Sequence, residues 1–223
     1  MLRSSRIMKH EHSKIAVIMD RSGSMASVHE ATVNGYNEFL NGQKLTPGTA
    51  DLMLVMFDDQ YEVRYDQPLT QVAPMLLADF VPRGSTALND AIGRTIVEVG
   101  ATLARMPEPN RAGKVILVIL TDGEENASKE FTREKLARMI GHQRDVYKWD
   151  FVFLGANQDA ILIGNEYNIP ASASITYNAN PVAMANVMRS AAAYTSNARS
   201  GRAQRSFSEE DRLGAAVPAK SKG

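Results

Sequence analysis

An apolar run that ends in an acid and is followed by two serines constrains this chain more than any other feature. Residues 15–19 are all apolar, and Asp20, Ser22 and Ser24 follow them. An unbroken apolar run of this length is typical of a central, buried strand of a parallel sheet. Gly23 then turns the chain into a helical pattern, so the acid and the hydroxyls lie on a loop at the carboxyl end of that strand. Open α/β sheets bind their ligands at that edge.

The three side chains of this loop suit a hard divalent cation. Asp20, Ser22 and Ser24 alternate along an extended segment, so their oxygens point the same way. One carboxylate and two hydroxyls form half of an all-oxygen site for a metal such as Mg²⁺. Asp20 and Ser22 could instead only cap the following helix. That alternative explains one loop, but two further segments carry matching oxygens.

The two further segments complete a recognisable pattern. Residues 84–91 form a loop that leads into a helix and contains Thr86, and the apolar run 115–120 is followed by Thr121, Asp122 and a glycine. In this order the three segments resemble the von Willebrand factor A (VWA) family. The metal-ion-dependent adhesion site (MIDAS) of that family uses Asp-x-Ser-x-Ser, a distant threonine and a distant aspartate before glycine. The resemblance implies that the metal ligands are Asp20, Ser22, Ser24, Thr86 and Asp122.

The resemblance also implies how these ligands work. Ser22 and Ser24 would bind the metal directly, Thr86 directly or through water, and the two aspartates through metal-bound waters or directly. The implied ion is Mg²⁺ or Mn²⁺, since both prefer similar oxygen sites. Two carboxylates leave a site with a doubly charged cation about neutral. The open position can therefore accept an Asp or Glu side chain from a protein partner.

Alternating strand and helix patterns predict an α/β fold. We expect a doubly wound, Rossmann-like, mostly parallel sheet with helices on both faces. Residues 58–60 separate two strands by a short hairpin, which predicts one antiparallel edge strand. The glycine fingerprints of nucleotide-binding loops do not occur in the sequence. The expected strands are 14–20, 51–57, 61–65, 114–120, 149–154 and 173–177, and the expected helices are 25–42, 70–78, 87–103, 132–142, 160–167 and 181–195.

The motifs span most of the 223 residues, so we expect one domain. The N-terminal residues 1–13 are polar and predict a flexible arm. The VWA-like domain is expected over 14–196. Residues 197–223 carry mixed charges and few large apolar side chains, which predicts a polar, disordered C-terminal tail.

Composition and charge exclude several classes of protein. The 25 basic residues balance 25 acidic ones, so no net charge attracts nucleic acid or an anionic membrane. The lack of cysteine favours a reducing compartment. The N-terminus has no apolar segment typical of a signal peptide, and the apolar runs are far shorter than the ~20 residues of a transmembrane helix. We therefore expect a cytoplasmic protein; its oligomeric state does not follow from the sequence.

A polar loop near the predicted metal site is a candidate for selecting the partner. In the VWA sheet order the strand 149–154 lies next to the strand 114–120, so the loop after it opens at the same edge. That loop contains Asn157, Gln158 and Asp159. Asn157 or Asp159 could instead only cap the following helix.

Other candidates for this rim lie within or beside the ligand loops. Glu124 and Glu125 follow Asp122, although they could only open a turn. Arg21 and Arg83 could meet an acidic partner or lie in solvent, and solvent is the favoured place for Arg21. The candidate rim consists of Arg83, Glu124, Glu125, Asn157, Gln158 and Asp159.

A second resemblance narrows the group of VWA proteins that this chain is similar to, but it does not indicate a function. The segments 35–40, 57–61, 82–87 and 153–159 resemble stand-alone bacterial and phage VWA proteins without a well-defined activity. The favoured function is a divalent-metal-dependent protein-binding module that recognises a metal-bridged acidic side chain. It is not an enzyme, because no nucleophile with an activating base is evident and the chain has no cysteine.

Two alternative functions stay open. The chain could be an adaptor subunit of an AAA+ ATPase or of a tellurite-resistance-type multi-protein system, which a helical or basic extension would favour. It could also be a magnesium-dependent phosphoryl hydrolase that uses Asp20 as its nucleophile. Phosphatases of the haloacid dehalogenase type need a second acid two residues later, where this chain has Ser22.

Overall fold

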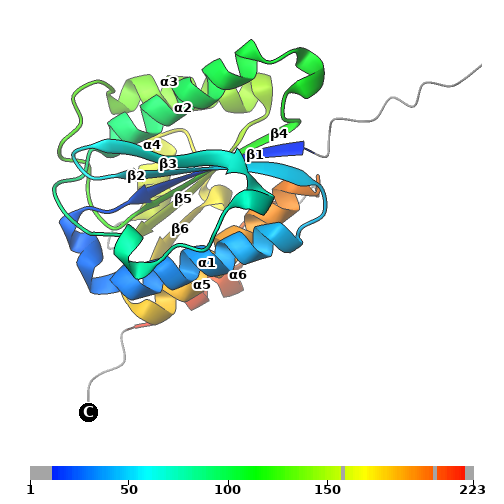
Figure 1. The fold of residues 1–223 in the computed structure, drawn as a ribbon. Coiled ribbons are helices and arrows are strands. Elements are labelled where there is room, and N and C mark those ends of the chain that lie inside the picture. Colours follow the sequence, from blue (N-terminus) through cyan, green and yellow to red (C-terminus); the bar gives the residue numbers. More distant parts are fainter. Residues whose placement is uncertain (1–11, 157–158, 203–204, 219–223) are drawn as a thin grey trace, which may run out of the picture.

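The computed structural model describes residues 12–156, 159–202 and 205–218. Within these ranges, six strands form one sheet in the order β3-β2-β1-β4-β5-β6 (Figure 1). β3 is antiparallel to β2, and the other neighbouring strands are parallel. The predicted fold class is confirmed, including the antiparallel edge strand. The strands are β1 (His12–Asp20), β2 (Thr49–Phe57), β3 (Tyr61–Pro68), β4 (Lys114–Thr121), β5 (Asp150–Ala156) and β6 (Ser174–Tyr177).

Helices cover both faces of the sheet, as a doubly wound fold requires (Figure 1). One layer contains α2 and α3, with α4 beside α3, and the other contains α1, α5 and α6. The α-helices are α1 (His29–Leu45), α2 (Leu88–Arg105), α3 (Arg133–Tyr147), α4 (Ala160–Glu166), α5 (Pro181–Arg199) and α6 (Glu209–Ala215). No helix in the described part of the chain is long and apolar enough to cross a membrane.

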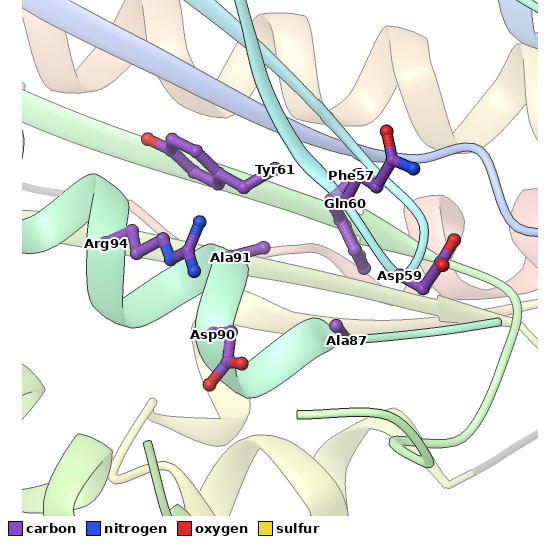
Figure 2. Close-up of a pocket in the computed structure, with 8 residues that line it drawn as sticks. All are labelled: Phe57, Asp59, Gln60, Tyr61, Ala87, Asp90, Ala91 and Arg94. Carbon is purple, nitrogen blue, oxygen red and sulfur yellow. The ribbon is translucent and has the colours of Figure 1, made fainter. Parts of the chain in front are cut away.

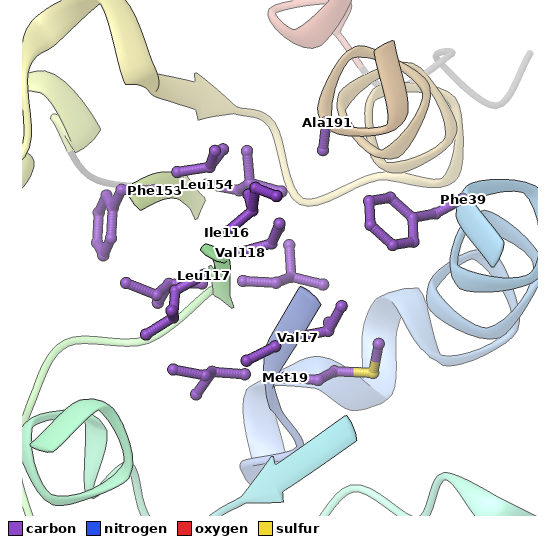
Figure 3. Close-up of a cluster of buried hydrophobic side chains, with 14 of the residues drawn as sticks. Val17, Met19, Phe39, Ile116, Leu117, Val118, Phe153, Leu154 and Ala191 are labelled. Carbon is purple, nitrogen blue, oxygen red and sulfur yellow. The ribbon is translucent and has the colours of Figure 1, made fainter. Parts of the chain in front are cut away.

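The core lies on both faces of the two central strands. Residues 15–19 of β1 and 116–120 of β4 are completely buried, which explains why both strands read as unbroken apolar runs. Figure 3 shows side chains of both strands between the helical layers, with Phe39 of α1 and Ala191 of α5 on one side. Truncating a fully buried aliphatic side chain to alanine typically costs about 2–5 kcal/mol. The candidate ligands Asp20 and Asp122 lie at the ends of these two core strands.

The first helix differs from its prediction at both ends. A 3-10 helix over Gly23–Val28 precedes α1, which continues beyond Gly42 to Leu45. A glycine within a helix costs only about 1 kcal/mol, which is too little to end α1. A Cβ on Gly42 would lie 3.6 Å from the Cβ of Ala192, which leaves the helices in ordinary contact.

The segment expected to form a helix over 70–78 is not an α-helix. It contains two short 3-10 turns, Leu69–Gln71 and Leu77–Asp79, joined by an extended stretch. Pro74 lies in that stretch, where a proline would break an α-helix by removing a backbone donor.

The prediction of disorder at the C-terminus is wrong for the described residues beyond 196. α5 continues to Arg199, and α6 packs against α5 and β6. Phe207 and Ala215 are buried. Ser208 caps α6 together with Asp211, whose carboxylate also accepts a hydrogen bond of 2.6 Å from Ser190 of α5. At the other end, residues 12 and 13 of the predicted arm belong to β1.

Candidate metal centre

The two acidic candidates come together because β1 and β4 are parallel neighbours. Asp20 is the last residue of β1, and Asp122 directly follows β4. The hydroxyl of Thr121 donates a hydrogen bond of 2.6 Å to Oδ2 of Asp20. The backbone N–H of Ser22 donates one of 2.7 Å to Oδ1 of the same carboxylate. Both oxygens of Asp20 are thus held by the backbone and side chains around it.

A chain of hydroxyls links the first loop to the third. The Oγ atoms of Ser22 and Ser24 are 3.1 Å apart. Ser24 also donates a hydrogen bond of 2.6 Å to Oδ1 of Asp122. Asp20, Ser22 and Asp122 are buried whereas Ser24 is exposed. The cluster therefore opens to solvent on the side of Ser24.

The second loop brings Thr86 to the same place. Its backbone N–H donates to Oδ1 of Asn126 at 2.9 Å, and the N–H of Asn126 donates to its carbonyl at 3.0 Å. A Cβ on Gly123 would lie 2.9 Å from Oγ1 of Thr86 and 3.7 Å from Oγ of Ser24. The Thr86 hydroxyl is therefore packed over Gly123, next to the serines. The structure places all five predicted ligands in one cluster.

Burial changes the acidity of both carboxyl groups. It raises the pKa of Asp20 to about 6, although hydrogen bonds from Thr121 and Ser22 oppose the shift and the nearby Asp122 adds to it. Burial also raises the pKa of Asp122, against a hydrogen bond from Ser24. Ionising these two neighbouring carboxyl groups therefore costs free energy, and a bound cation would offset that cost.

The donor set fits a hard divalent cation. The five side chains offer only carboxylate and hydroxyl oxygens, the ligands that Mg²⁺ and Mn²⁺ prefer. Among the residues that the structure describes, no group of three or more His, Cys, Asp or Glu side chains could hold a metal. A metal at this edge of the sheet would therefore need the hydroxyls of Ser22, Ser24 and Thr86. These residues would hold it with two carboxylates beside them.

No family model and no curated protein matches this sequence. Solved structures match at 11–16% identity. One is a von Willebrand factor type A protein from Catenulispora acidiphila (16% identity, TM-score 0.58), with 84% of this chain and 43% of that protein covered. Another is the pilus adhesin SpaC from Lactobacillus rhamnosus GG (11%, TM-score 0.64; 84% and 31% covered).

A third match is proximal thread matrix protein 1 from the mussel byssus, solved with a zinc-occupied MIDAS motif (16%, TM-score 0.55; 83% and 46% covered). The chain has the von Willebrand factor A fold. It spans less than half of the length of each of these three proteins. The likeness concerns the fold alone.

The surroundings of Arg21 differ from the prediction. Arg21 is buried, not in solvent as predicted. Its Nε donates a hydrogen bond of 3.0 Å to Oδ2 of Asp58, and its Nη1 donates one of 2.7 Å to Glu62. Arg83 is half exposed and donates from Nε to the same oxygen of Asp58 at 2.8 Å.

Asp58 was not predicted from the sequence as a residue of this site. It is the first residue of the turn between β2 and β3, at the edge of the sheet that carries the ligand loops. Burial would raise the pKa of Asp58, but hydrogen bonds from Arg83 and Gln60 and the charge of Arg21 lower it overall. The sequence signal that could have pointed to Asp58 was an acid directly after β2, the strand next to β1.

The remaining rim candidates have different surroundings. Glu125 accepts hydrogen bonds from the backbone of Asn89 in the first turn of α2 and from Ser128, which ties the third loop to that helix. Glu124 is exposed. Asp159 caps α4 by accepting from the backbone of the next turn. Asn157 and Gln158 lie outside the described residues. A role for each of these residues in partner binding stays a prediction.

A cleft of about 310 Å³ lies beside the Thr86 loop of this VWA fold (Figure 2). One wall is the turn between β2 and β3, and the other is the first part of α2. Its walls include Phe57, Asp59, Gln60, Tyr61, Ala87 and Arg94. Arg94 is already paired with Glu130, and its guanidinium lies over the ring of Tyr61. The lining of the cleft therefore mixes apolar, polar and charged side chains.

Proposed function

We propose that this chain is a divalent-metal-dependent protein-binding module. Asp20, Ser22, Ser24, Thr86 and Asp122 hold one Mg²⁺ or Mn²⁺ ion, and a partner protein completes its coordination with an Asp or Glu side chain. The rim residues around the site then select among partners. The lack of cysteine in the sequence favours a cytoplasmic location for this module.

One observation carries this proposal. Three loops that are far apart in the sequence bring five oxygen-bearing side chains together, and a continuous path of hydrogen bonds joins Ser22, Ser24 and Asp122. Helix capping explains none of this: no side chain caps the 3-10 helix after Ser22 or the first turn of α1. Two carboxylates against a doubly charged ion leave the centre about neutral, which suits an acidic ligand from a partner.

Binding fits these residues better than phosphoryl hydrolysis. A nucleophilic aspartate needs a free oxygen that faces the substrate. Both oxygens of Asp20 accept hydrogen bonds, and its side chain is completely buried. An adaptor subunit of an ATPase system is a special case of the proposed function. The helix α6 packs on its own domain and so does not supply the free helical extension that would favour that case.

Metal titration by calorimetry tests the proposal. We expect the wild-type protein to bind one Mn²⁺ or Mg²⁺ ion, and Asp20→Ala and Thr86→Ala to bind it much more weakly while keeping the fold. Thr70→Ala, at an exposed threonine in the 3-10 turn after β3, is the matched control and should bind like the wild type. Unchanged affinity in both site variants would rule out the assignment.

Capture of partners from a lysate tests the second half of the proposal. Proteins retained in Mg²⁺ should be released by a chelator and should not be retained by Asp20→Ala. Replacing Asn157 and Gln158 with alanine should reduce capture and leave metal affinity intact. Capture that is equal with and without chelator would show that the metal does not bridge the partner.

A further inference from the structure

The carboxylate of Asp58 joins two of the three ligand loops. It is completely buried. Its Oδ2 accepts the Nε hydrogen bonds of both Arg21 and Arg83, at 3.0 and 2.8 Å. Its Oδ1 accepts a hydrogen bond of 2.7 Å from the backbone of Gln60, which fixes the carboxylate on its own turn. Hydrogen bonds to charged groups are stronger than neutral ones.

The two arginines lie inside the loops that carry the candidate ligands. Arg21 stands between Asp20 and Ser22, and Arg83 lies three residues before Thr86. Backbone hydrogen bonds run alongside the ion pairs. The N–H of Arg83 donates to the carbonyl of Arg21 at 2.8 Å, and the N–H of Ala87 donates to the carbonyl of Asp58 at 2.8 Å. The turn, the first loop and the second loop thus form one connected unit.

Asp58 also pairs with a buried positive charge. The side chain of Arg21 is only 6% exposed, and its Nη2 has no hydrogen-bond partner among the described residues. Glu62, which accepts a hydrogen bond of 2.7 Å from Nη1, is the other carboxylate that this guanidinium contacts. Losing one of two carboxylate partners of a buried charge is unfavourable. Asp58 and Glu62 together hold Arg21, and with it the first ligand loop, against the hairpin of β2 and β3.

We propose that Asp58 is a positioning residue for the metal centre, acting through Arg21 and Arg83. It joins the loops that carry Ser22 and Thr86 and so holds both side chains at the spacing that the metal requires. This inference rests on the proposed metal function. It goes further by assigning a role to three residues that are not ligands.

Arg83 separates this role from a purely structural one. Its side chain is about half exposed, and the buried Asp58 carboxylate keeps Arg21 and the backbone of Gln60 as partners when Arg83 is removed. Removing it should therefore leave the fold stable while loosening the Thr86 loop. A structural role alone would predict no effect on the metal.

The test compares Mn²⁺ affinity by calorimetry with thermal melting, on the full chain. We expect Arg83→Ala and Asp58→Asn to weaken Mn²⁺ binding by about 10- to 100-fold, the usual effect of losing outer support for metal ligands. Arg83→Ala should melt close to the wild type, whereas Asp58→Asn should melt lower. Arg83→Lys keeps the charge but cannot reproduce the Nε geometry, so it should restore little of the affinity.

Asp66→Asn is the matched control. Asp66 is the carboxylate partner of the buried Lys14, which lies six residues before Asp20 on β1 and hence roughly 20 Å from it. This variant should melt lower and bind Mn²⁺ like the wild type. Equal weakening in Asp66→Asn would attribute the effect to general destabilisation and overturn the inference.

The outcomes separate the inference from the proposed function. Wild-type affinity in Arg83→Ala overturns the inference even if Asp58→Asn does not fold. A wild-type protein that binds no Mn²⁺ overturns the proposed function and the inference with it. Strong wild-type binding together with unaffected variants overturns the inference alone.

Discussion

At the scale of single residues, Gly123 is the position where the smallest change should disturb the metal centre. A Cβ there would come within 2.9 Å of the Thr86 hydroxyl, so the threonine would have to move. We expect Gly123→Ala to weaken Mn²⁺ binding by about 10-fold or more and to leave melting nearly unchanged, because the residue lies in a partly exposed loop. Calorimetry and thermal melting measure the two effects.

Gly100→Ala provides the comparison for this substitution. Gly100 lies within α2, and a Cβ there meets nothing closer than 4.0 Å. The change should raise the free energy of unfolding by up to about 1 kcal/mol, the helix preference of alanine over glycine, and should not alter metal affinity. Full metal affinity in Gly123→Ala would mean that the Thr86 hydroxyl is not a ligand or can move at no cost.

The residues of the site divide into those that the sequence could predict and those that it could not. Asp20 and Asp122 each follow an apolar run. Because the carboxyl ends of parallel strands lie at the same edge of a sheet, the sequence pattern was sufficient to predict that the two carboxylates lie close together. Asp58 and Asn126 act through hydrogen bonds to other loops, at 2.8–3.0 Å. Those contacts depend on how far each loop reaches in three dimensions, which no local pattern encodes. For the same reason, the sequence does not predict the burial of Arg21.

At the scale of elements, the helix α6 depends on one carboxylate. Asp211 accepts hydrogen bonds from the hydroxyls of Ser190 and Ser208 and from the backbone of Ser208. Burial opposes these bonds, but together they lower the pKa of Asp211. We expect Asp211→Asn to cost about 1 kcal/mol at pH 7, as the loss of a cap does, or roughly 2–4 °C of melting temperature.

The cost should depend on pH in a definite direction. A carboxyl group whose pKa is lower in the folded than in the unfolded protein stabilises the fold above the unfolded value, about 3.9. That contribution disappears as the pH falls through the folded pKa. The melting difference between wild type and Asp211→Asn should therefore shrink below about pH 4. A difference that stays constant down to pH 2.5 would show that charge plays no part.

The same helix shows why part of the fold could not be predicted. The alternation of strands and helices was sufficient for the sheet, because its central strands β1 and β4 contain long apolar runs. α6 has seven residues, too few for a convincing apolar period, and only Ala215 of the helix is buried. Its polar sequence reads as a tail. The available signal was the Ser208-x-x-Asp211 cap, which resembles a capping box.

At the scale of the whole molecule, folding should not require the metal. The candidate ligands lie at the ends of strands, whereas the core consists of completely buried side chains along β1, β4 and β5. Chelation should therefore remove only the free energy of binding, about 2.7 kcal/mol at a metal concentration 100 times the dissociation constant. Calorimetric melting should show a decrease of roughly 5–10 °C in chelator, with a single cooperative transition retained.

The variant Asp20→Ala distinguishes this binding effect from a direct effect of the chelator. Since it lacks a ligand carboxylate, its melting temperature should be the same with Mg²⁺ and with chelator. Removing a buried carboxyl group whose pKa is raised relieves an unfavourable charge but takes the acceptor from the Thr121 hydroxyl and the Ser22 N–H, so the variant should melt somewhat below the chelated wild type. Loss of the cooperative transition of the wild type in chelator would instead show that the metal holds the sheet edge together, and that the strand ends are not rigid without it.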